Sequence, residues 1–242
     1  MFFVTITERS VSNCNQMKNM STSFPVKSSH KFSKGALAIL SVAESLFAQK
    51  GFKATSISEI AKKTGGSKAN IYHHFKSKEH LYQETLELAC EHVFDVLQPS
   101  KGQLSSDPKQ RLKEYITLHL KSMIEQPNST NLIKRELMDN NQIEGRLLAK
   151  DIFTTIFKKV AALVFDTHEI EKESHNISAT LQAFMLIGVN MFFFDSQSVM
   201  KYLPDMSSLS DSPEAFSNMI FDLIINQSSI SDVDLTEENS NA

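Results

Sequence analysis

The chain has 242 residues, of which 41% are hydrophobic and 22% charged. This composition excludes a globally disordered chain and leaves room for one large or two small domains. Only 7 glycines and 6 prolines interrupt it, which favours helices over an all-β fold rich in turns. The 2 cysteines, Cys14 and Cys90, are too few for a disulfide framework or a four-thiolate zinc site, so we interpret both as free thiols in a reducing compartment.

The longest uninterrupted apolar runs, such as 183–189, are much shorter than the roughly 18–20 residues that span a membrane. The first ten residues also lack the basic-then-apolar order of a signal peptide. We therefore expect a cytoplasmic protein with no membrane partner. Residues 1–30, rich in Ser, Asn and Thr, are predicted to form a disordered arm, and the true start is left open between Met1, Met17 and Met20.

The net charge of −3 conceals a strong asymmetry along the chain. Residues 27–80 hold ten lysines and three glutamates, whereas residues 81–242 hold 13 basic and 24 acidic side chains. A basic block of this kind indicates that the N-terminal region binds a polyanion such as DNA. The alternative is a lysine-rich face that is only solvated.

Two helices are predicted at the start of the basic block. Apolar residues recur every three or four positions between Ala36 and Phe47, and this amphipathic helix ends at Gly51. Ser56 and Glu59 then form a capping box, in which the hydroxyl accepts from a free backbone amide and the carboxylate reaches back. The second helix is short because a Thr-Gly-Gly break follows it at 64–66.

Helical patterns continue through the rest of the chain. Ser67 is predicted to cap a third helix over 68–75, and Ser77 a fourth that runs to about residue 97. Five further helices are predicted over 108–126, 129–139, 141–165, 172–200 and 212–228. No segment alternates apolar and polar residues for the length of a strand, so we expect an all-α fold with an acidic flexible tail at 229–242.

Two short helices joined by a glycine turn within a basic block form a helix-turn-helix arrangement. Residues 51–81 read GFKATSISEIAKKTGGSKANIYHHFKSKEHL, which combines a glycine and threonine before the second helix, an Ile-Ala pair within it and an Ile-Tyr-x-x-Phe-x-x-Lys ending. Over about 32–92 this segment resembles the DNA-binding domain of the tetracycline-repressor (TetR) family. The resemblance implies an N-terminal three-helix helix-turn-helix domain over 31–92, with the motif at about 55–75, and a C-terminal helical ligand-binding and dimerisation domain over 93–228.

The third predicted helix has a clear inner and outer face. Ile71 and Phe75 lie four residues apart and are expected to pack against the first two helices. Ala69, Asn70 and His73 then point outward. In a major groove Ala69 can contact a thymine methyl group, Asn70 an adenine edge, and His73 a base acceptor or a phosphate.

The resemblance adds further expected DNA contacts on the second and third helices, and it implies a phosphate contact at Lys78. The full predicted DNA-binding set is Thr55, Ser56, Ser58, Lys68, Ala69, Asn70, Tyr72, His73, His74 and Lys78. Asn70 as an ordinary exposed residue and Tyr72 as mainly a packing residue stay open as alternatives. A metal pair at His73 and His74 is disfavoured because adjacent helical side chains diverge by about 100°.

Phenylalanine and methionine are concentrated in the second half of the chain, where core packing is the alternative for any single residue. By resemblance, a small molecule binds in this half and releases the DNA, and the composition favours an apolar one. The predicted effector pocket comprises Met123, Met138, Phe153, Phe157, Phe184 and Met185.

The resemblance also implies that the last two long helices build a two-fold bundle between two copies of the chain. The residues expected at this homodimer interface are Ala183, Gly188, Met191, Phe216 and Ile220. A dimer would hold two recognition helices about 34–36 Å apart on a palindromic operator in double-stranded DNA.

Other function classes find less support in the sequence. There is no nucleophile elbow, phosphate-binding glycine loop or HExxH motif, so we do not expect an enzyme. We interpret one cluster of acidic residues and histidines as a connection between helices rather than a metal site, namely His168, Glu169, Glu171, Glu173 and His175. We therefore expect neither a metal nor a cofactor. We predict a repressor, with an activator or an architectural DNA-binding protein that has no effector as the alternatives.

Overall fold

A computed structural model describes residues 32–97, 104–138, 146–171, 179–204 and 206–226, and every regular element in these ranges is helical. The elements are α2 (Lys34–Ala54), α3 (Ile57–Thr64), α4 (Lys68–His74), α5 (Lys78–Phe94) with a 3-10 turn η2 (Asp95–Leu97), α6 (Pro108–Glu125), α7 (Pro127–Met138), α8 (Arg146–Glu171), α9 (Ala179–Met200), α10 (Ser207–Ser210) and α11 (Pro213–Asn226). The predicted all-α fold class is confirmed.

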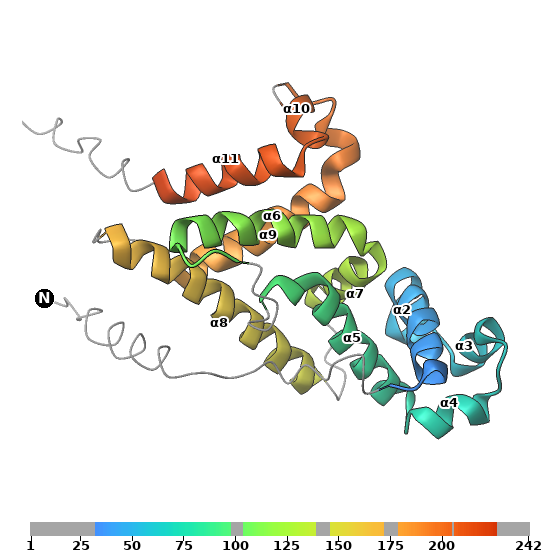
Figure 1. Ribbon diagram of the computed structural model, residues 1–242. Helices are drawn as coiled ribbons and strands as arrows, with labels where there is room; N and C mark the ends of the chain where they lie inside the picture. The colour runs from blue at the N-terminus through green and yellow to red at the C-terminus, as the bar shows by residue number, and fades with distance from the viewer. Residues whose placement is uncertain (1–31, 98–103, 139–145, 172–178, 205, 227–242) are drawn as a thin grey trace, which may run out of the picture.

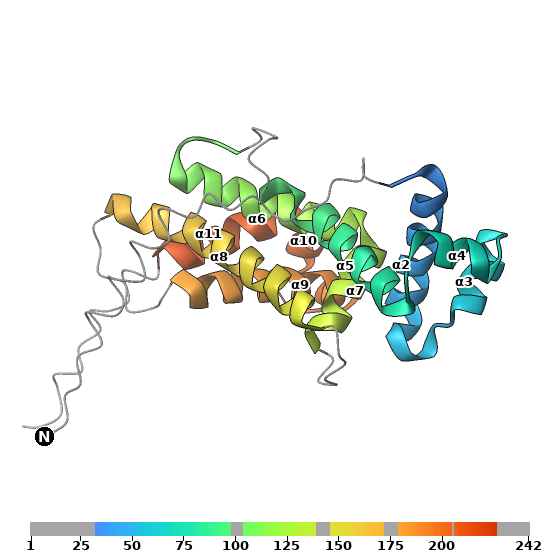
Figure 2. The same cartoon turned by 90° about the horizontal axis from the view of Figure 1, so that it is seen from below.

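The helices fall into two groups along the molecule. Helices α2, α3 and α4 form one end, while α6, α8, α9 and α11 make up the bulk of the other (Figure 1). Helix α5 runs from the α4 end towards the large group, and α7 lies beside both α2 and α5 (Figure 2). Among the described helices, the small end therefore meets the rest of the protein mainly through α5 and α7.

The predicted helix positions agree with the structure apart from several boundaries. Gly51, at φ 78° and ψ 173°, interrupts α2 where the sequence predicts its end, although a short helical turn continues to Ala54. Helix α8 extends to Glu171, beyond the predicted end at 165, and the four-residue α10 was not predicted. The predicted arm and tail, Cys14 and the side chains of the acidic connection at 168–175 lie outside what the structure describes.

The core of the small end confirms the predicted inner face of the third helix. Ile71 and Phe75 are each 1% exposed, and they belong to the same buried apolar core as Leu40 and Phe47 of α2. Because α4 is only 7 residues long, these two side chains supply most of the apolar burial that holds it in place. In α5, burial raises the pKa of the Cys90 thiol, which keeps this free cysteine protonated and unreactive.

The large group contains a buried polar cluster between α6 and α9. Asn190 lies 3.0 Å from Nδ1 of His119 and donates to the carbonyl of Ile116 at 3.3 Å. The His119 ring stacks between Phe94 and Tyr115, with centroids 4.7 and 5.4 Å away. Burial lowers the pKa of His119 to about 3, so the imidazole is neutral at physiological pH and Asn190 donates to Nδ1.

One helix of the described ranges, α9, is long and apolar enough to cross a membrane by length and composition, with 33% of the relevant window buried. The search for uninterrupted apolar runs missed it because polar residues such as Gln182 and Asn190 interrupt the sequence. These two side chains are buried against the neighbouring helices, and Asp195 pairs with Lys134 of α7 at 2.5 Å. Helix α9 is thus packed into the helical bundle. A helix packed in this way can pass the same test of length and composition as a membrane span.

The neutral His119 predicts a specific pH dependence of stability. Below about pH 6 the unfolded chain takes up a proton at this residue, whereas the folded chain does not until about pH 3, so acid destabilises the fold. We expect the free energy of unfolding of the wild type, relative to His119→Gln, to fall by up to about 1.4 kcal/mol per pH unit between roughly pH 6 and pH 4. Denaturant unfolding across this range measures the difference, and a constant difference would contradict the assignment.

Candidate nucleic-acid interface

Serine caps place each of the three helices that follow α2. The hydroxyl oxygens of Ser56, Ser67 and Ser77 accept from the backbone amide three residues further on, at 3.1, 3.2 and 3.1 Å. Gly65 ends α3 in the left-handed conformation at φ 69°, which any side chain would disfavour. The two helices of the motif therefore have sharply defined ends, and the turn between them is tight.

The outward face of α4 is the one that the sequence predicts. Side chains of five residues are exposed there: Lys68, Ala69, Asn70, Tyr72 and His73. Tyr72 is 51% exposed, so its ring is available to a partner rather than buried in the core. A small side chain, an amide and an imidazole next to one another make a surface that can enter a major groove and contact base edges.

Gly66 contributes to this face in a way that the sequence analysis missed. A Cβ at this position would lie 3.3 Å from Nδ2 of Asn70. The Asn70 amide therefore rests close to the backbone of the turn, and a larger residue at 66 would displace it. The signal for this was the second glycine of the pair at 65–66, since only the first has a positive φ.

Thr55 requires a correction. It is 1% exposed, and its hydroxyl donates to the carbonyls of Leu46 at 3.2 Å and Gly51 at 2.9 Å. Its side chain is therefore committed to the fold and is not available to contact DNA. The neighbouring Ser56 and Ser58 are exposed at the start of α3, although the Ser56 hydroxyl also serves as the helix cap.

His74 also differs from its predicted position on the contact surface. It is half-buried, and its Nε2 would lie 3.4 Å from a Cβ on Gly35, at the start of α2. The side chain therefore packs back on the first helix, while the exposed His73 ring lies 5.2 Å away at a steep angle. Among residues that the structure describes, no group of three or more His, Cys, Asp or Glu side chains is arranged to hold a metal ion.

Lys78 lies in the first turn of α5 with its ammonium group 4.3 Å from the centre of the Phe52 ring. Partial burial lowers the pKa of Lys78, while the neighbouring Glu79 opposes this shift. The aromatic ring limits where the ammonium can go, because a cation is attracted to the face of the ring. The lysine is thus positioned at the edge of the helix-turn-helix rather than swinging freely in solvent.

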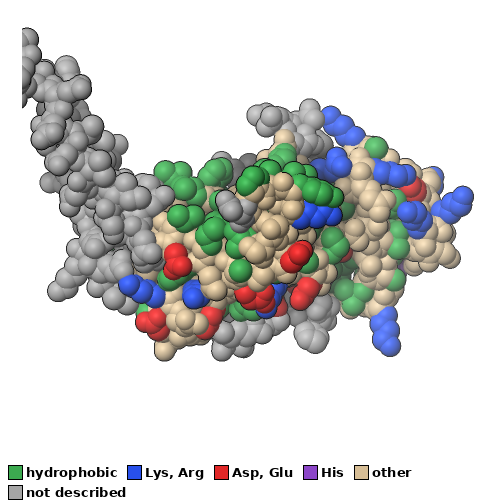
Figure 3. Space-filling view, turned by 90° about the horizontal axis from the view of Figure 1, so that it is seen from above, with side chains coloured by type: hydrophobic (Ala, Val, Ile, Leu, Met, Phe, Trp, Pro, Cys, Tyr) green, Lys and Arg blue, Asp and Glu red, His purple; other side chains and the backbone are tan. Residues whose placement is uncertain are grey.

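Positive charge gathers at this end of the molecule (Figure 3). Its exposed lysines include Lys53, Lys62, Lys63, Lys68 and Lys76. Lys50 is instead paired with Glu59 at 2.5 Å. Since the field of several exposed lysines is summed over the surface, these side chains favour an approaching polyanion even without individual contacts.

Within the described ranges, the residues predicted to form the effector pocket differ widely in burial and do not line one enclosed site. Met123 is buried and Phe153 is partly buried, but Met138, Phe184 and Met185 are 66%, 62% and 40% exposed. Phe157 of α8 stacks on Phe184 at 5.9 Å, near the surface. Helical periodicity predicts which side of a helix is apolar but not what covers that side. The burial of the described residues therefore separates the three exposed residues from the buried Met123, and the pocket stays a prediction.

The predicted dimer contacts also divide. Ala183, Phe216 and Ile220 are buried within the chain's own core, at 0%, 5% and 8% exposure, and need a correction because a second copy cannot reach them. Met191 is half-buried. Gly188 is exposed, and a Cβ there would meet no atom within 4 Å.

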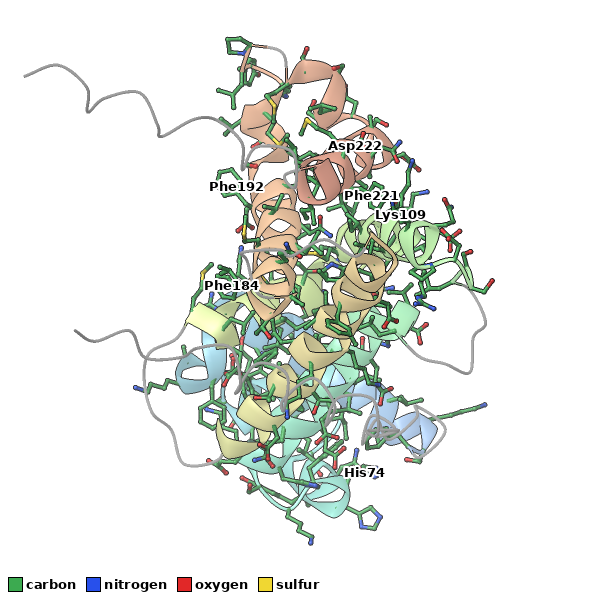
Figure 4. All side chains as sticks on the ribbon, turned by 90° about the vertical axis from the view of Figure 1, so that its left-hand side faces the viewer. His74, Lys109, Phe184, Phe192, Phe221 and Asp222 are labelled. Atoms are coloured by element: carbon green, nitrogen blue, oxygen red, sulfur yellow. The ribbon has the colours of Figure 1, made fainter. Side chains whose placement is uncertain are left out.

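An exposed apolar stripe runs along α9 instead. Its members share one side of the helix, and Figure 4 shows Phe184 and Phe192 along that side. We call these residues the α9 stripe: Leu181, Phe184, Met185, Gly188, Phe192 and Val199. Phe192 is 72% exposed, so the stripe is an apolar surface that the described part of the chain leaves mostly uncovered.

The comparisons with known proteins concern the helix-turn-helix region first. Residues 39–85 match the family model described as bacterial regulatory proteins, tetR family. The chain is 36% identical to the HTH-type transcriptional regulator AcrR of Shigella flexneri, over 36% of this chain and 40% of the relative. It is 32% identical to the HTH-type transcriptional regulator RutR of Escherichia coli K12, over 57% of this chain and 64% of the relative. These matches span less than two thirds of each relative, and both relatives are named as regulators rather than enzymes, as the sequence analysis expected.

Solved structures extend the similarity of fold to most of the chain. The TetR-family regulator PfmR of Thermus thermophilus superposes with a TM-score of 0.57 at 23% identity, covering 77% of this chain and 92% of that one. The regulator FadR of Bacillus subtilis, solved in complex with stearoyl-CoA, superposes with a TM-score of 0.61 at 18% identity, covering 78% and 97%. The predicted architecture, an N-terminal helix-turn-helix domain followed by a helical C-terminal domain, is confirmed.

The geometry of α4 predicts different effects for two substitutions. Asn70→Ala should weaken binding to the preferred sequence and relax the preference at one base pair, because a bidentate amide contact contributes about 1–3 kcal/mol of base discrimination. Lys78→Ala should weaken binding to all sequences about equally and reduce the salt dependence by about one phosphate contact. Gel-shift titrations on the preferred site and single-base variants measure both effects. If neither substitution changes binding, α4 and the start of α5 do not contact the DNA.

Proposed function

Because the chain belongs to the TetR family of bacterial regulatory proteins, we propose that it is a sequence-specific DNA-binding transcriptional repressor of the bacterial cytoplasm. The observation that carries this proposal is the outward face of α4. Ala69, Asn70 and His73 are exposed side by side on a helix whose opposite side is buried, at the basic end of the molecule. A short exposed helix with small and amide side chains, surrounded by lysines, fits the major groove of duplex DNA.

Affinity and specificity have separate sources in this arrangement. The lysines around α3 and α4 neutralise phosphates and release counterions, which makes binding strong at low salt for any sequence. The face of α4 adds hydrogen bonds and a methyl contact that depend on the bases. Lys78 on its aromatic support would fix the position of the domain along the backbone, so that Asn70 meets the same base pair each time.

The α9 stripe supports a homodimer. An apolar surface of this size is unusual on a monomeric protein in water, and a second copy of α9 would cover it. Gly188, with open space where a Cβ would stand, would let two such helices approach closely near the middle of the stripe. A partner helix also accounts for the high hydropathy of α9, whose uncovered face would then be buried in protein. Two copies related by a two-fold axis would present two α4 helices to a palindromic site.

The buried polar cluster supports a small-molecule effector in the C-terminal domain. Three of its atoms have no hydrogen-bond partner among the residues described, namely the Tyr115 hydroxyl, Nε2 of His119 and Oδ1 of Asn190. Unpartnered buried polar atoms are costly, so a ligand with a neutral polar group would gain free energy by satisfying them. Binding that favours a conformation with displaced α4 helices would release the DNA by its difference in affinity for the two states.

Selection of bound duplexes from a random DNA pool tests the function directly. We expect the purified protein to enrich a palindrome with two similar half-sites, because each copy presents the same α4 face. Repeating the selection with candidate small molecules present would show loss of the enriched sequence for an effector. No enrichment of any duplex at low ionic strength would exclude the proposal, and enrichment without any effect of small molecules would leave a DNA-binding protein that has no effector.

The proposed dimer gives a prediction for the α9 stripe. Phe192→Glu places a charge at the most exposed stripe position, so the partner helix could cover it only by desolvating a carboxylate, and the dimer should dissociate. Sedimentation should show a monomer, and circular dichroism should show the helical content of the wild type. Affinity for a palindrome, measured by titration, should fall roughly tenfold or more. Ser198→Glu is the matched control, because Ser198 is exposed on the same helix but lies about 120° around it from Phe192. A dimeric Phe192→Glu protein would show that another surface joins the two copies.

A further inference from the structure

Helix α7 is the place where three parts of the molecule meet. It packs against α2 of the DNA-binding domain and against α5, which leads from that domain into the rest of the chain. Three consecutive residues near its C-terminal end, Lys134, Arg135 and Glu136, each reach a different helix. We call these three residues the α7 triplet.

Arg135 binds the end of the first helix of the DNA-binding domain. Its Nε donates to the carbonyl of Ala48 at 3.3 Å, and its Nη2 donates to the carbonyl of Gln49 at 3.2 Å. The guanidinium also lies directly against Gly51, 3.4 Å from where a Cβ would stand. A fork of donors with a positive charge suits the negative end of a helix, where carbonyls point outward. Arg135 therefore holds α2 at the point where Gly51 interrupts it.

The segment that Arg135 holds leads directly into the motif. Gly51 accepts from the hydroxyl of Thr55 at 2.9 Å on the inner side of the turn. Thr55 is followed by Ser56, the cap of α3. Only a few residues thus separate Gly51 from the start of α3. The hydroxyl of Thr55 binds this segment on its buried side, and Arg135 of α7 binds the end of α2 on the other side. A shift of Arg135 would move the direction in which α3 and α4 leave α2.

The other two triplet residues fix α7 itself. Glu136 accepts from the hydroxyl of Tyr82, in α5, at 2.6 Å. Lys134 pairs at 2.5 Å with Asp195 of α9, which lies on the same face of that helix as the α9 stripe. The triplet therefore connects the helix that we propose joins the two copies with the helix that carries the DNA-binding domain.

We propose that Arg135 is a positioning residue that sets the distance between the two DNA-binding domains, and hence the spacing of half-sites that the protein accepts. This inference rests on the proposed function, because it applies only to a dimer on a palindrome. One extra base pair between half-sites moves one of them by about 3.4 Å and turns it by about 34–36°. If Arg135 holds the DNA-binding domain rigidly on α7, the domain cannot follow that movement and the protein loses affinity. If the connection is loose, the domain can follow the displaced half-site.

The test compares operator spacing in wild type and Arg135→Gln. Affinities are measured by fluorescence anisotropy on the palindrome selected from the random pool, on versions with one or two base pairs added or removed between half-sites, and on a single half-site. The wild type should lose about tenfold or more for a change of one base pair, since one of its two α4 helices then leaves its groove. Arg135→Gln should bind the best spacing roughly tenfold less tightly, because charged hydrogen bonds are lost, and its profile across the panel should be flatter.

Two further variants make the result specific. Lys158→Gln removes the same charge from an exposed position on α8 and should keep the wild-type profile. Tyr82→Phe removes only the hydroxyl that binds Glu136 and leaves a ring beside Phe47. It should flatten the profile in the same direction, and it takes the place of Arg135→Gln if that variant does not fold. Binding to the single half-site should be unchanged in all variants, because none of these residues lies on the α4 face.

The inference and the proposed function fail differently. A wild type that selects a palindrome, together with variants that keep its steep dependence on spacing, would overturn the role of Arg135 and leave the function standing. Equal loss on the half-site and the palindrome would also overturn it, because Arg135 would then act on recognition rather than on spacing. A wild type that selects no palindrome would overturn the proposed function itself.

Discussion

The burial of Ile71 and Phe75 against α2 is the interaction on which the rest of the structure depends. Helix α4 has 7 residues, too few to be stable as an isolated helix in water, so it exists because these two side chains are held in an apolar core. Their burial decides which residues face outward. Ala69, Asn70 and His73 form a contact surface only as long as the opposite side of the helix is anchored.

Helix α9, unlike α4, carries apolar side chains on both sides. The side that faces the protein is mainly apolar but also buries the polar Gln182 and Asn190, whereas the outer side exposes Phe184 and Phe192. Such an arrangement is unfavourable for a single chain in water, because apolar surface stays hydrated while polar groups need internal partners. A second copy over the α9 stripe resolves the first half of this conflict, and a polar ligand at the Tyr115–His119–Asn190 cluster would resolve the second.

Helix α7 links these two ends of the molecule. The DNA-binding domain is small, and among the described elements it is held mainly by α5 and α7, so its orientation follows these two helices. The interactions of Arg135 with the end of α2 and of Lys134 with α9 make one short connection between the proposed dimer surface and the proposed DNA surface. A change in the C-terminal domain that moves α7 would therefore move the end of α2, and with it α3 and α4.

The sequence alone determined the helical class, the helix-turn-helix and the outward face of α4, because each depends on local rules. Capping serines, a left-handed glycine and the spacing of Ile71 and Phe75 act within a few residues, and no distant contact overrides them. Only the tertiary structure decided the roles of Thr55, Phe184 and Arg135. A threonine before a helix has the same pattern whether it is buried or exposed, and an apolar stripe has the same period whether its own chain covers it or a second copy must. Arg135 meets carbonyls more than eighty positions earlier in the chain, and the pattern of neighbouring residues carries no record of contacts at that distance.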